Sequence, residues 1–329
     1  MENEDIGERE FLSNIKHLVR KIPGSRLGFD DDASDIPLNE KESIVINVDT
    51  FVTSTDKLPG MSYAQAGRKT AVMTLSDLAA KGASPQGMLL SACIGEDSET
   101  ESIYECIRGF SQYCLKSDVP FLGGDLGHSK EIILTGVGIG TASPADIVKR
   151  RGAQLGDIIT VTDTFGLSSV AFKVLIDGYS AEENLRNRAI KAAYKPSIHP
   201  RIISELSKDS LVTSSMDSSD GLGITLNTMA QHSGNLFLID RLPVAAGVEG
   251  FAESHDLDVM ELVMQGGEEF SLVLTVLPDQ WDDAVAIAER EGTKLLPIGK
   301  VREGSGVRYM SDSTETVIPA KGYDVLKKG

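Results

Sequence analysis

Aspartates recur where strands, helices or short glycine and serine turns are expected to meet loops. They are Asp30, Asp31, Asp32, Asp49, Asp77, Asp125, Asp217 and Asp220. Carboxylate oxygens are the hard ligands that Mg²⁺ selects, usually together with water and substrate phosphate. Each acid alone is typical of a turn or a helix cap, but the set favours a divalent-cation site, because functional side chains gather at such positions. Cations held there could neutralise charge during phosphoryl transfer.

The common phosphate-binding motifs are missing from the sequence. It has no GxxxxGK[ST] loop and no HRD or DFG set, which excludes the P-loop enzymes and the protein kinases. Gly136, Gly138 and Gly140 have only GxGxG spacing, so we interpret them as glycines that allow close packing of a strand. The serines of segment 166–169 are more typical of helix caps than of a phosphate loop.

Cysteine and histidine give no sign of a soft-metal site. Cys93, Cys106 and Cys114 lack CxxC spacing, and the last two continue an apolar helical stripe, which predicts small buried hydrophobic residues. The five histidines form no HExxH or HxxxH pair. The sequence therefore indicates neither a zinc knuckle, nor a disulfide framework, nor a histidine-ligated metal.

The charge balance limits the partners that the chain can have. Lys and Arg number 32 against 49 Asp and Glu, a formal net charge of −17. Such an excess of acid argues against binding nucleic acid through its phosphates. No apolar stretch approaches the roughly 18 residues of a membrane span, and the acidic N-terminus lacks the features of a signal peptide. We therefore expect a cytoplasmic protein with no membrane partner.

Strands and helices alternate through the first half of the chain. Residues 44–48 alternate in the manner of a strand that ends at Asp49, and 63–81 has the apolar periodicity of a helix, with Asp77 on the face opposite the apolar one. Ser62 and Gln65 suit a capping box at the start of that helix. Further strands are expected at 87–94 and 132–139 and a helix at 98–116, with Asp125 after a Gly-Gly turn.

The second half continues this pattern after a plausible boundary at 143–146. A strand is expected at 157–162, and helices begin near Ser168 and at Ser219. Strands follow near 236–239 and 270–276. With about 150 residues per domain, the length of 329 residues predicts two α/β or α+β domains, which we assign to 1–143 and 144–329.

Eight blocks in a fixed order resemble the thiamine-monophosphate kinases, in the superfamily that contains aminoimidazole ribonucleotide synthetase. The blocks are LGFDDDAS (27–34), NVDTFV (47–52), GRKTAVMTLSDLAAKGASP (67–85), GGD (123–125), RRGAQLGD (150–157), SMDSSDGLG (215–223), GGEEFSL (266–272) and KGYD (321–324). They span nearly the whole chain. Other branches fit less well. Selenophosphate synthetase has a reactive cysteine or selenocysteine near its N-terminus, but no cysteine precedes Cys93 here. The hydrogenase-maturation relative uses a C-terminal cysteine, but none follows Cys114. Ser76 stands where aminoimidazole ribonucleotide synthetase usually has Asn.

The resemblance implies a fold and a reaction. The fold would be the two-domain aminoimidazole ribonucleotide synthetase-like fold, in which the N-terminal domain dimerises through its strands and nucleotide binds in a cleft near that interface. The reaction would be ATP plus thiamine monophosphate giving ADP and thiamine diphosphate, by direct in-line attack. Because a phosphate monoester is already a competent nucleophile, no residue is expected to act as a strong general base. Several Mg²⁺ ions and positioning would supply the catalysis.

The resemblance also implies roles for individual residues. The expected metal ligands are Asp32, Asn47, Val48 through its carbonyl, Asp49, Asp77, Asp125, Asp217 and Asp220. The expected nucleotide contacts are Gly124, Asp125, Arg150 and Ser219. Asp56, Glu268 and Tyr323 fall on the substrate side, where a carboxylate can balance a thiazolium and an aromatic ring can stack on it.

Two positions depart from the family pattern. Asp30 stands where the family has Gly, and Asp56 lies where it usually has a substrate-side His. An ionised acid cannot donate a hydrogen bond to a phosphate. Two alternatives therefore stay open: another ATP-dependent small-molecule enzyme of the superfamily, or a catalytically silent protein that binds nucleotide and metal.

Overall fold

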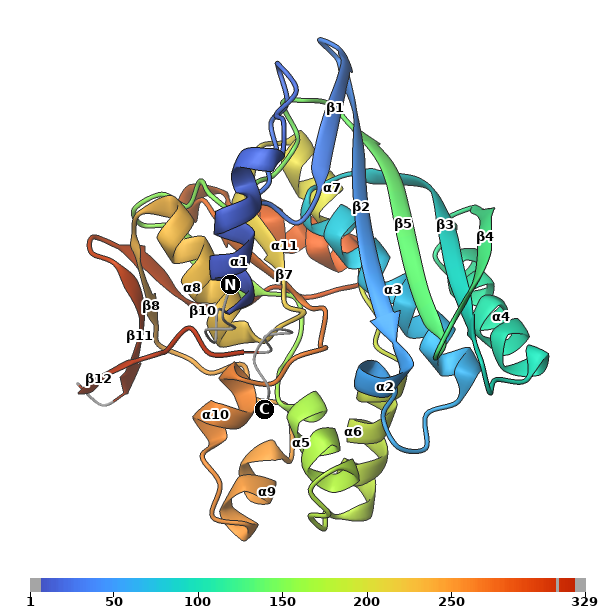
Figure 1. Cartoon of the computed structure of the whole chain (residues 1–329). Helices are drawn as coiled ribbons and strands as arrows, with labels where there is room; N and C mark the ends of the chain where they lie inside the picture. The colour runs from blue at the N-terminus through green and yellow to red at the C-terminus, as the bar shows by residue number, and fades with distance from the viewer. Residues whose placement is uncertain (1–6, 312–313, 323–329) are drawn as a thin grey trace.

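A computed structural model describes residues 7–311 and 314–322, which form two β-sheets with helices packed between and around them (Figure 1). The first sheet has five strands in the order β1-β2-β5-β3-β4. These strands are β1 (Ser34–Asn39), β2 (Glu42–Val52), β3 (Ser84–Gly95), β4 (Phe121–Ser129) and β5 (Ile133–Ala142). The β3–β4 pair is parallel and the other pairs are antiparallel.

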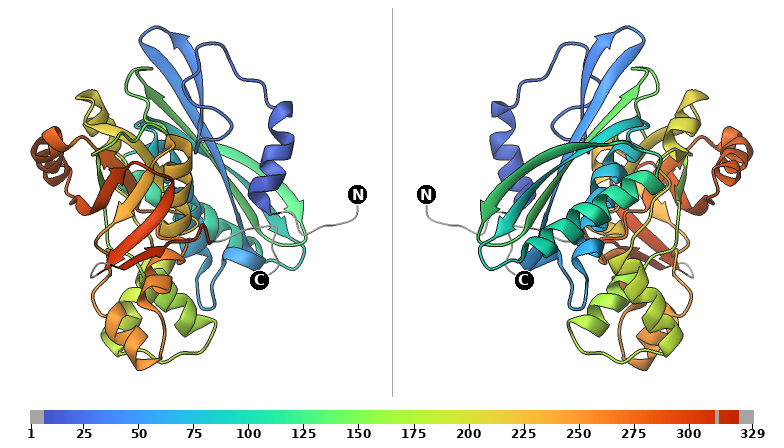
Figure 2. Two further views of the ribbon diagram at one scale, coloured as in Figure 1. Left: turned by 90° about the vertical axis from the view of Figure 1, so that its left-hand side faces the viewer. Right: turned by 90° about the vertical axis from the view of Figure 1, so that its right-hand side faces the viewer.

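Two long helices, α3 (Tyr63–Ala80) and α4 (Thr100–Lys116), cover one face of this sheet (Figure 2). The predicted capping box forms at the start of α3: Ser62 accepts from the backbone N–H of Gln65, and the Gln65 side chain accepts from that of Ser62. A Cβ at Gly136 would lie 2.0 Å from Thr74 Oγ1, so the glycines of β5 let α3 pack against the strand, as predicted.

The other face of the five-stranded sheet is largely exposed. It carries the alternate residues of β2 and β5, and Val48 is 64% exposed there. The N-terminal helix α1 (Glu8–Ile15) lies on this side of the sheet in Figure 2. The sheet therefore has one covered face and one face that is apolar and accessible.

The second sheet has seven strands in the order β12-β11-β8-β10-β6-β9-β7, all antiparallel except the parallel β8–β11 pair. Its strands are β6 (Ile158–Val161), β7 (Val212–Asp217), β8 (Leu236–Ile239), β9 (Leu272–Val276), β10 (Leu296–Arg302), β11 (Gly306–Ser311) and β12 (Thr314–Val317). The accompanying helices are α5 (Leu167–Leu175), α6 (Glu183–Tyr194), α7 (Ile202–Lys208), α8 (Leu222–Ser233), α9 (Val248–Ser254), α10 (Val259–Met264) and α11 (Trp281–Arg290). Short helical turns are α2 (Thr53–Asp56), η1 (Lys16–Leu18) and η2 (Pro278–Gln280).

Helix α3 lies between the two sheets rather than on a surface. It contacts β2 and β5 on one side and β7 of the second sheet on another. The polar side opposite the apolar face is therefore largely covered, and Lys69 and Ser76 on this helix are fully inaccessible. The prediction for the helix itself was right. Its polar face is covered as well, because β7 of the second sheet packs against it.

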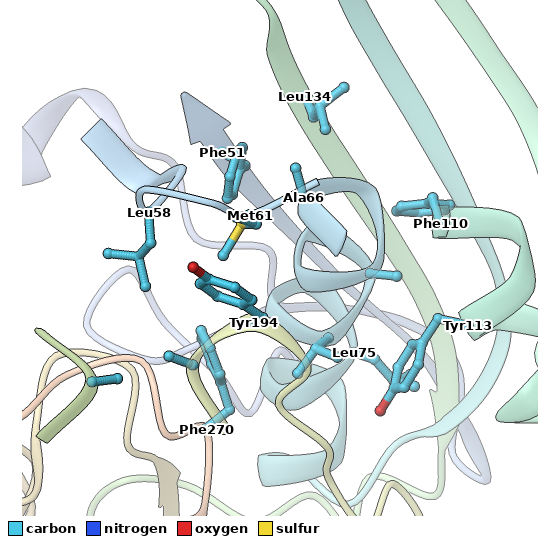
Figure 3. Packing of buried hydrophobic residues seen from close by; sticks show 14 of the residues in the cluster. Phe51, Leu58, Met61, Ala66, Leu75, Phe110, Tyr113, Leu134, Tyr194 and Phe270 are labelled. Carbon is cyan, nitrogen blue, oxygen red and sulfur yellow. The ribbon is translucent and has the colours of Figure 1, made fainter. Parts of the chain in front are cut away.

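The apolar core continues from the first sheet toward the second half of the chain. Phe51 of β2 and Met61 belong to one buried cluster with Tyr194 and Phe270, which come from the second half (Figure 3). Cys106 and Cys114 are buried in the same cluster, as predicted, and burial raises the pKa of each thiol to about 12. Among the described residues, no helix is long and apolar enough to cross a membrane.

Three expected boundaries differ from the structure. Asp49 does not end its strand, because β2 continues through the apolar pair Phe51 and Val52. Asp125 lies inside β4 rather than after the turn predicted from the Gly-Gly pair, although Gly123 does have a positive φ of 112°. The helix expected at Ser219 begins only at Leu222.

Candidate functional site

Three carboxylates from distant parts of the chain converge where α3 meets β7. Asp32 lies in the loop before β1, Asp77 in the last turn of α3, and Asp217 at the end of β7. One oxygen of each lies within 4.8 Å of the others. All three were predicted as metal ligands, and the structure brings them together into what we call the acidic cluster.

The Asp32 end of the acidic cluster is paired with two cations. Arg150 donates from Nε to Asp32 Oδ1 at 2.7 Å and also from Nη2. Lys81 Nζ lies 2.6 Å from Asp32 Oδ2 and 2.5 Å from Asp31 Oδ1. Burial alone would raise the pKa of Asp32, but Arg150 and Lys81 outweigh it and lower that pKa below its ordinary value.

At the opposite end of the acidic cluster, the side-chain donors within the described residues are neutral. Asn47 Nδ2 donates to Asp77 Oδ2 at 3.1 Å, and Ser76 Oγ donates to Asp217 Oδ2 at 2.7 Å. Burial and the neighbouring Asp217 raise the pKa of Asp77 well above its usual range. Burial and Asp32 raise the pKa of Asp217 to about 7. Uncompensated negative charge therefore accumulates here.

Asp49 extends this charge along β2. Burial, followed by the charge of Asp220, raises the pKa of Asp49 to about 7, so these two acids adjoin the cluster. Asn47 Oδ1 is buried and has no hydrogen-bond partner within the described part of the chain. An unpaired amide oxygen beside several carboxylates is an all-oxygen donor set, which fits Mg²⁺ and not a thiolate- or imidazole-seeking metal.

Asp125 and Gly124 lie away from the acidic cluster, and so does the side chain of Val48, whose predicted role was through its backbone carbonyl. Thr50 Oγ1 contacts Thr135 Oγ1 at 3.1 Å on the exposed face of the first sheet. Thr135 pairs with Ser91, and Ser91 pairs with Asp125, so Asp125 lies on that same face. The side chain of Val48 lies on the exposed face too, and Gly124 is an exposed residue of the edge strand β4. One copy of the chain therefore does not bring Asp125 to the acidic cluster.

The predicted substrate side is built on a strained loop. Glu268 and Phe270 adopt positive φ angles of 64° and 55°, which are uncommon for residues with bulky side chains. Glu268 pairs with Lys69 Nζ at 2.5 Å. Burial raises the pKa of Glu268, and Lys69 opposes this shift. Asp56 accepts from the backbone N–H of Val52 at 2.7 Å, so it caps its own turn rather than standing free in a loop.

A cavity of about 260 Å³ adjoins Glu268. Ser168 and Glu269 also line it, and basic residues of α6 stand at its rim. Glu269 accepts from the backbone N–H of Gly166 at 2.7 Å, next to the start of α5. Burial raises the pKa of Glu269 to about 8. The prediction that the serines cap this helix was wrong: Ser169 Oγ donates to the carbonyl oxygen of Leu262, and the N-cap residue of α5 is Gly166, which has no side chain.

The remaining predicted residues fall around these features. Ser219 accepts from the N–H of Glu268 through its carbonyl and so links the loop to the segment before α8. Tyr323 lies outside the described residues. Sequence reasoning missed Lys69 and Lys81, two fully buried lysines. Both lie within the block 67–85, but lysines on a helix are usually surface residues, and nothing local revealed their distant acidic partners.

Comparison with known proteins agrees with this geometry. Residues 30–142 match the family described as AIR synthase related protein, N-terminal domain. A thiamine-monophosphate kinase of Nitrosopumilus maritimus is 34% identical over 93% of this chain and 96% of its own length. One of Synechococcus elongatus is 30% identical, over 97% of this chain and 96% of its own.

Solved structures match over the whole molecule. AaThiL complexed with AMPPCP and TMP superposes with a TM-score of 0.84 at 25% identity and covers 99% of each chain. The protein tt0281 of Thermus thermophilus has a TM-score of 0.82 at 31% identity, over 93% of this chain and 96% of its own. The resemblance and the fold class inferred from the sequence blocks are thus confirmed. The chain belongs to the thiamine-monophosphate kinase family.

Proposed function

We propose that this protein transfers the γ-phosphoryl group of ATP to thiamine monophosphate, forming ADP and thiamine diphosphate. Family membership and the likeness to a protein complexed with AMPPCP and TMP support this reaction. The observation that carries it is the acidic cluster, in which three carboxylates converge and only Asp32 is paired with cations among the described residues. Such a site needs bound cations, and a phosphoryl transfer between two anions supplies the reason for them.

In this mechanism the protein positions its substrates and holds charge. Asp77, Asp217, Asp49 and Asn47 Oδ1 would hold Mg²⁺, which when bound neutralises phosphate charge and orients the reacting oxygens. An oxygen of the substrate phosphate attacks the γ-phosphorus in line, and the bond from that phosphorus to the ADP oxygen breaks. Glu268, held by Lys69, would face the thiazolium cation. No side chain has to remove a proton, because the attacking phosphate is already ionised.

The assembly and the domain division stay proposals. We propose that two copies associate through the exposed face of the five-stranded sheet, which presents Ile46 and Val48 to solvent, and that this association brings Asp125 and Gly124 to a nucleotide. The two sheets support a division near residue 143, since β1–β5 end at Ala142 and β6 begins at Ile158. A cytoplasmic location is proposed from the sequence alone.

Product analysis tests the proposed reaction. The purified protein is incubated with ATP, Mg²⁺ and thiamine monophosphate, and in parallel with a panel of other phosphate monoesters, and products are identified by mass spectrometry. We expect thiamine diphosphate to form far faster than any other product. A different preferred acceptor would indicate another superfamily enzyme, which the departure at Asp56 leaves open. Nucleotide binding without turnover would indicate a silent protein.

A further inference from the structure

Lys81 is a buried cation inside the acidic site that the proposed reaction does not use. It follows the last residue of α3 and is fully inaccessible. Its ammonium lies 2.5 Å from Asp31 Oδ1, 2.6 Å from Asp32 Oδ2 and 2.9 Å from the carbonyl oxygen of Ser215. Three oxygens, two from the loop before β1 and one from β7, thus surround one positive charge, in the way that oxygen ligands surround a bound metal ion.

The surroundings explain why a cation is needed at this point. The carbonyl end of α3, with its partial negative charge, faces the same region as the acidic cluster. Asp31 and Asp32 face Lys81, and Arg150 holds the other oxygen of Asp32. Asp77 and Asp217 have neither cation within salt-bridge distance and rely on Asn47 and Ser76. The two ends of the cluster therefore differ in how their charge is balanced.

We infer that Lys81 is a resident cation of the acidic site, occupying a position between Asp31 and Asp32 that a divalent ion would otherwise take. Metal ions are then held at the Asp77 and Asp217 end, and Lys81 positions the Asp32 carboxylate without contacting the reacting atoms. This inference rests on the proposed use of the acidic cluster as a metal site. It adds that the protein itself supplies one of the charges, which lowers the number of ions that must bind.

Removing the charge of Lys81 should vacate that position. The matched variant is Lys81→Met, with Lys69→Met as control, because Lys69 is an equally buried lysine of α3 whose partner is Glu268 rather than an acid of the cluster. Bound Mn²⁺ is counted by electron paramagnetic resonance in the absence of nucleotide, and Mg²⁺-dependent melting curves are recorded. We expect Lys81→Met to bind an additional Mn²⁺ per chain. We also expect the Mg²⁺ concentration that gives half of the maximal rise in Tm to be roughly tenfold lower for Lys81→Met than for the native protein.

The controls separate this inference from the proposed reaction. Lys69→Met should melt earlier, because it also loses a buried ion pair, but its Mn²⁺ count should stay that of the native protein. Lys81→Gln tests the same idea if Lys81→Met does not fold, and folding of either variant only in Mg²⁺ would support it. An unchanged ion count and Mg²⁺ dependence in the foldable Lys81 variant would overturn the inference. The kinase assay on thiamine monophosphate judges the proposed function independently.

Discussion

The two faces of β2 carry different chemistry one residue apart. Asn47, Asp49 and Phe51 point toward α3, where the first two adjoin the acidic cluster and the third enters the core. Val48 and Thr50 point to the exposed face. Because successive residues of a strand face opposite ways, the block NVDTFV builds a charged interior and an exposed surface simultaneously. Neighbours in a motif are thus not neighbours in the site.

The largest expected effect concerns the covered face. Asp77→Asn and Asp49→Asn should each lower kcat at least about a hundredfold, because each removes charge that holds metal in the transition state. Asp177→Asn is a suitable control, since Asp177 is an exposed acid paired with Lys173 on α5. Turnover is measured at saturating Mg²⁺. Near-native turnover in both cluster variants would contradict a shared metal site.

Asp125→Asn sharpens the comparison between the faces. The family resemblance predicts a loss of about a hundredfold here too, although Asp125 lies on the exposed face. A loss of that size, measured in the same kinetic assay, would mean that a second copy brings this face to the nucleotide. Near-native kcat would show instead that Asp125 is an ordinary surface acid and that its predicted role was wrong.

A charge on the exposed face should break the proposed dimer. Ile46→Asp places a carboxylate among apolar side chains and should shift the protein from dimer to monomer, with molar mass measured by light scattering after size exclusion. Leu115→Asp is the matched control, since Leu115 is 82% exposed at the end of α4 on the opposite side of the sheet. Equal masses for Ile46→Asp and the native protein would argue against this interface.

The covered face should also make stability depend on pH. Burial and neighbouring acids raise the pKa values of Asp49 and Asp217 to about 7 in the folded chain, above the ordinary value of 3.8. The folded state then binds more protons than the unfolded state between about pH 4 and 7, so stability falls as pH rises through this window. We expect the Tm of metal-free protein to drop from pH 5 to pH 8, and Mg²⁺ to reduce that drop. A metal-free Tm that rises over this range would contradict the raised pKa values.

The smallest effect is expected at Asp56. Its carboxylate accepts from the Val52 N–H and lies near Glu268, so its charge acts on the substrate side through neighbours. Asp56→His should improve the thiamine monophosphate KM by a few fold, or lower the Mg²⁺ concentration needed, because it removes a negative charge from the side where an anionic substrate binds. Steady-state kinetics over a range of Mg²⁺ measures both. No change in either would place Asp56 outside the site.

Local patterns predicted much of the fold. The alternation of 44–48 and the capping box at Ser62 gave a strand and a helix that the structure contains. The predicted strand ends were less accurate where apolar residues continue a strand beyond an acid, as Phe51 and Val52 do after Asp49. A strand end is decided by its partners, and β5 pairs with β2 as far as Val52.

The site was only partly predictable, because the direction in which a side chain points also depends on partner strands that are distant in the sequence. Residue types and the family blocks identified Asp32, Asp77 and Asp217, which converge. They could not reveal that Asp125 faces the other way, because that depends on register across three strand pairs. Nor could they reveal the pairing of Arg150 with Asp32, which are 118 residues apart in the sequence.

The burial of α3 between the sheets gives the site a fixed length. Lys69, which holds Glu268, and Asp77, in the acidic cluster, belong to the same continuous helix. At about 1.5 Å per residue their backbones are about 12 Å apart along its axis. If Glu268 meets the thiazolium and Asp77 holds metal, as proposed, the helix fixes the distance between the organic end and the phosphate end of the substrate. On that proposal, a longer or shorter substrate would not fit by repacking of side chains alone. It would require an insertion or deletion, and one residue would rotate half of the site by about 100°.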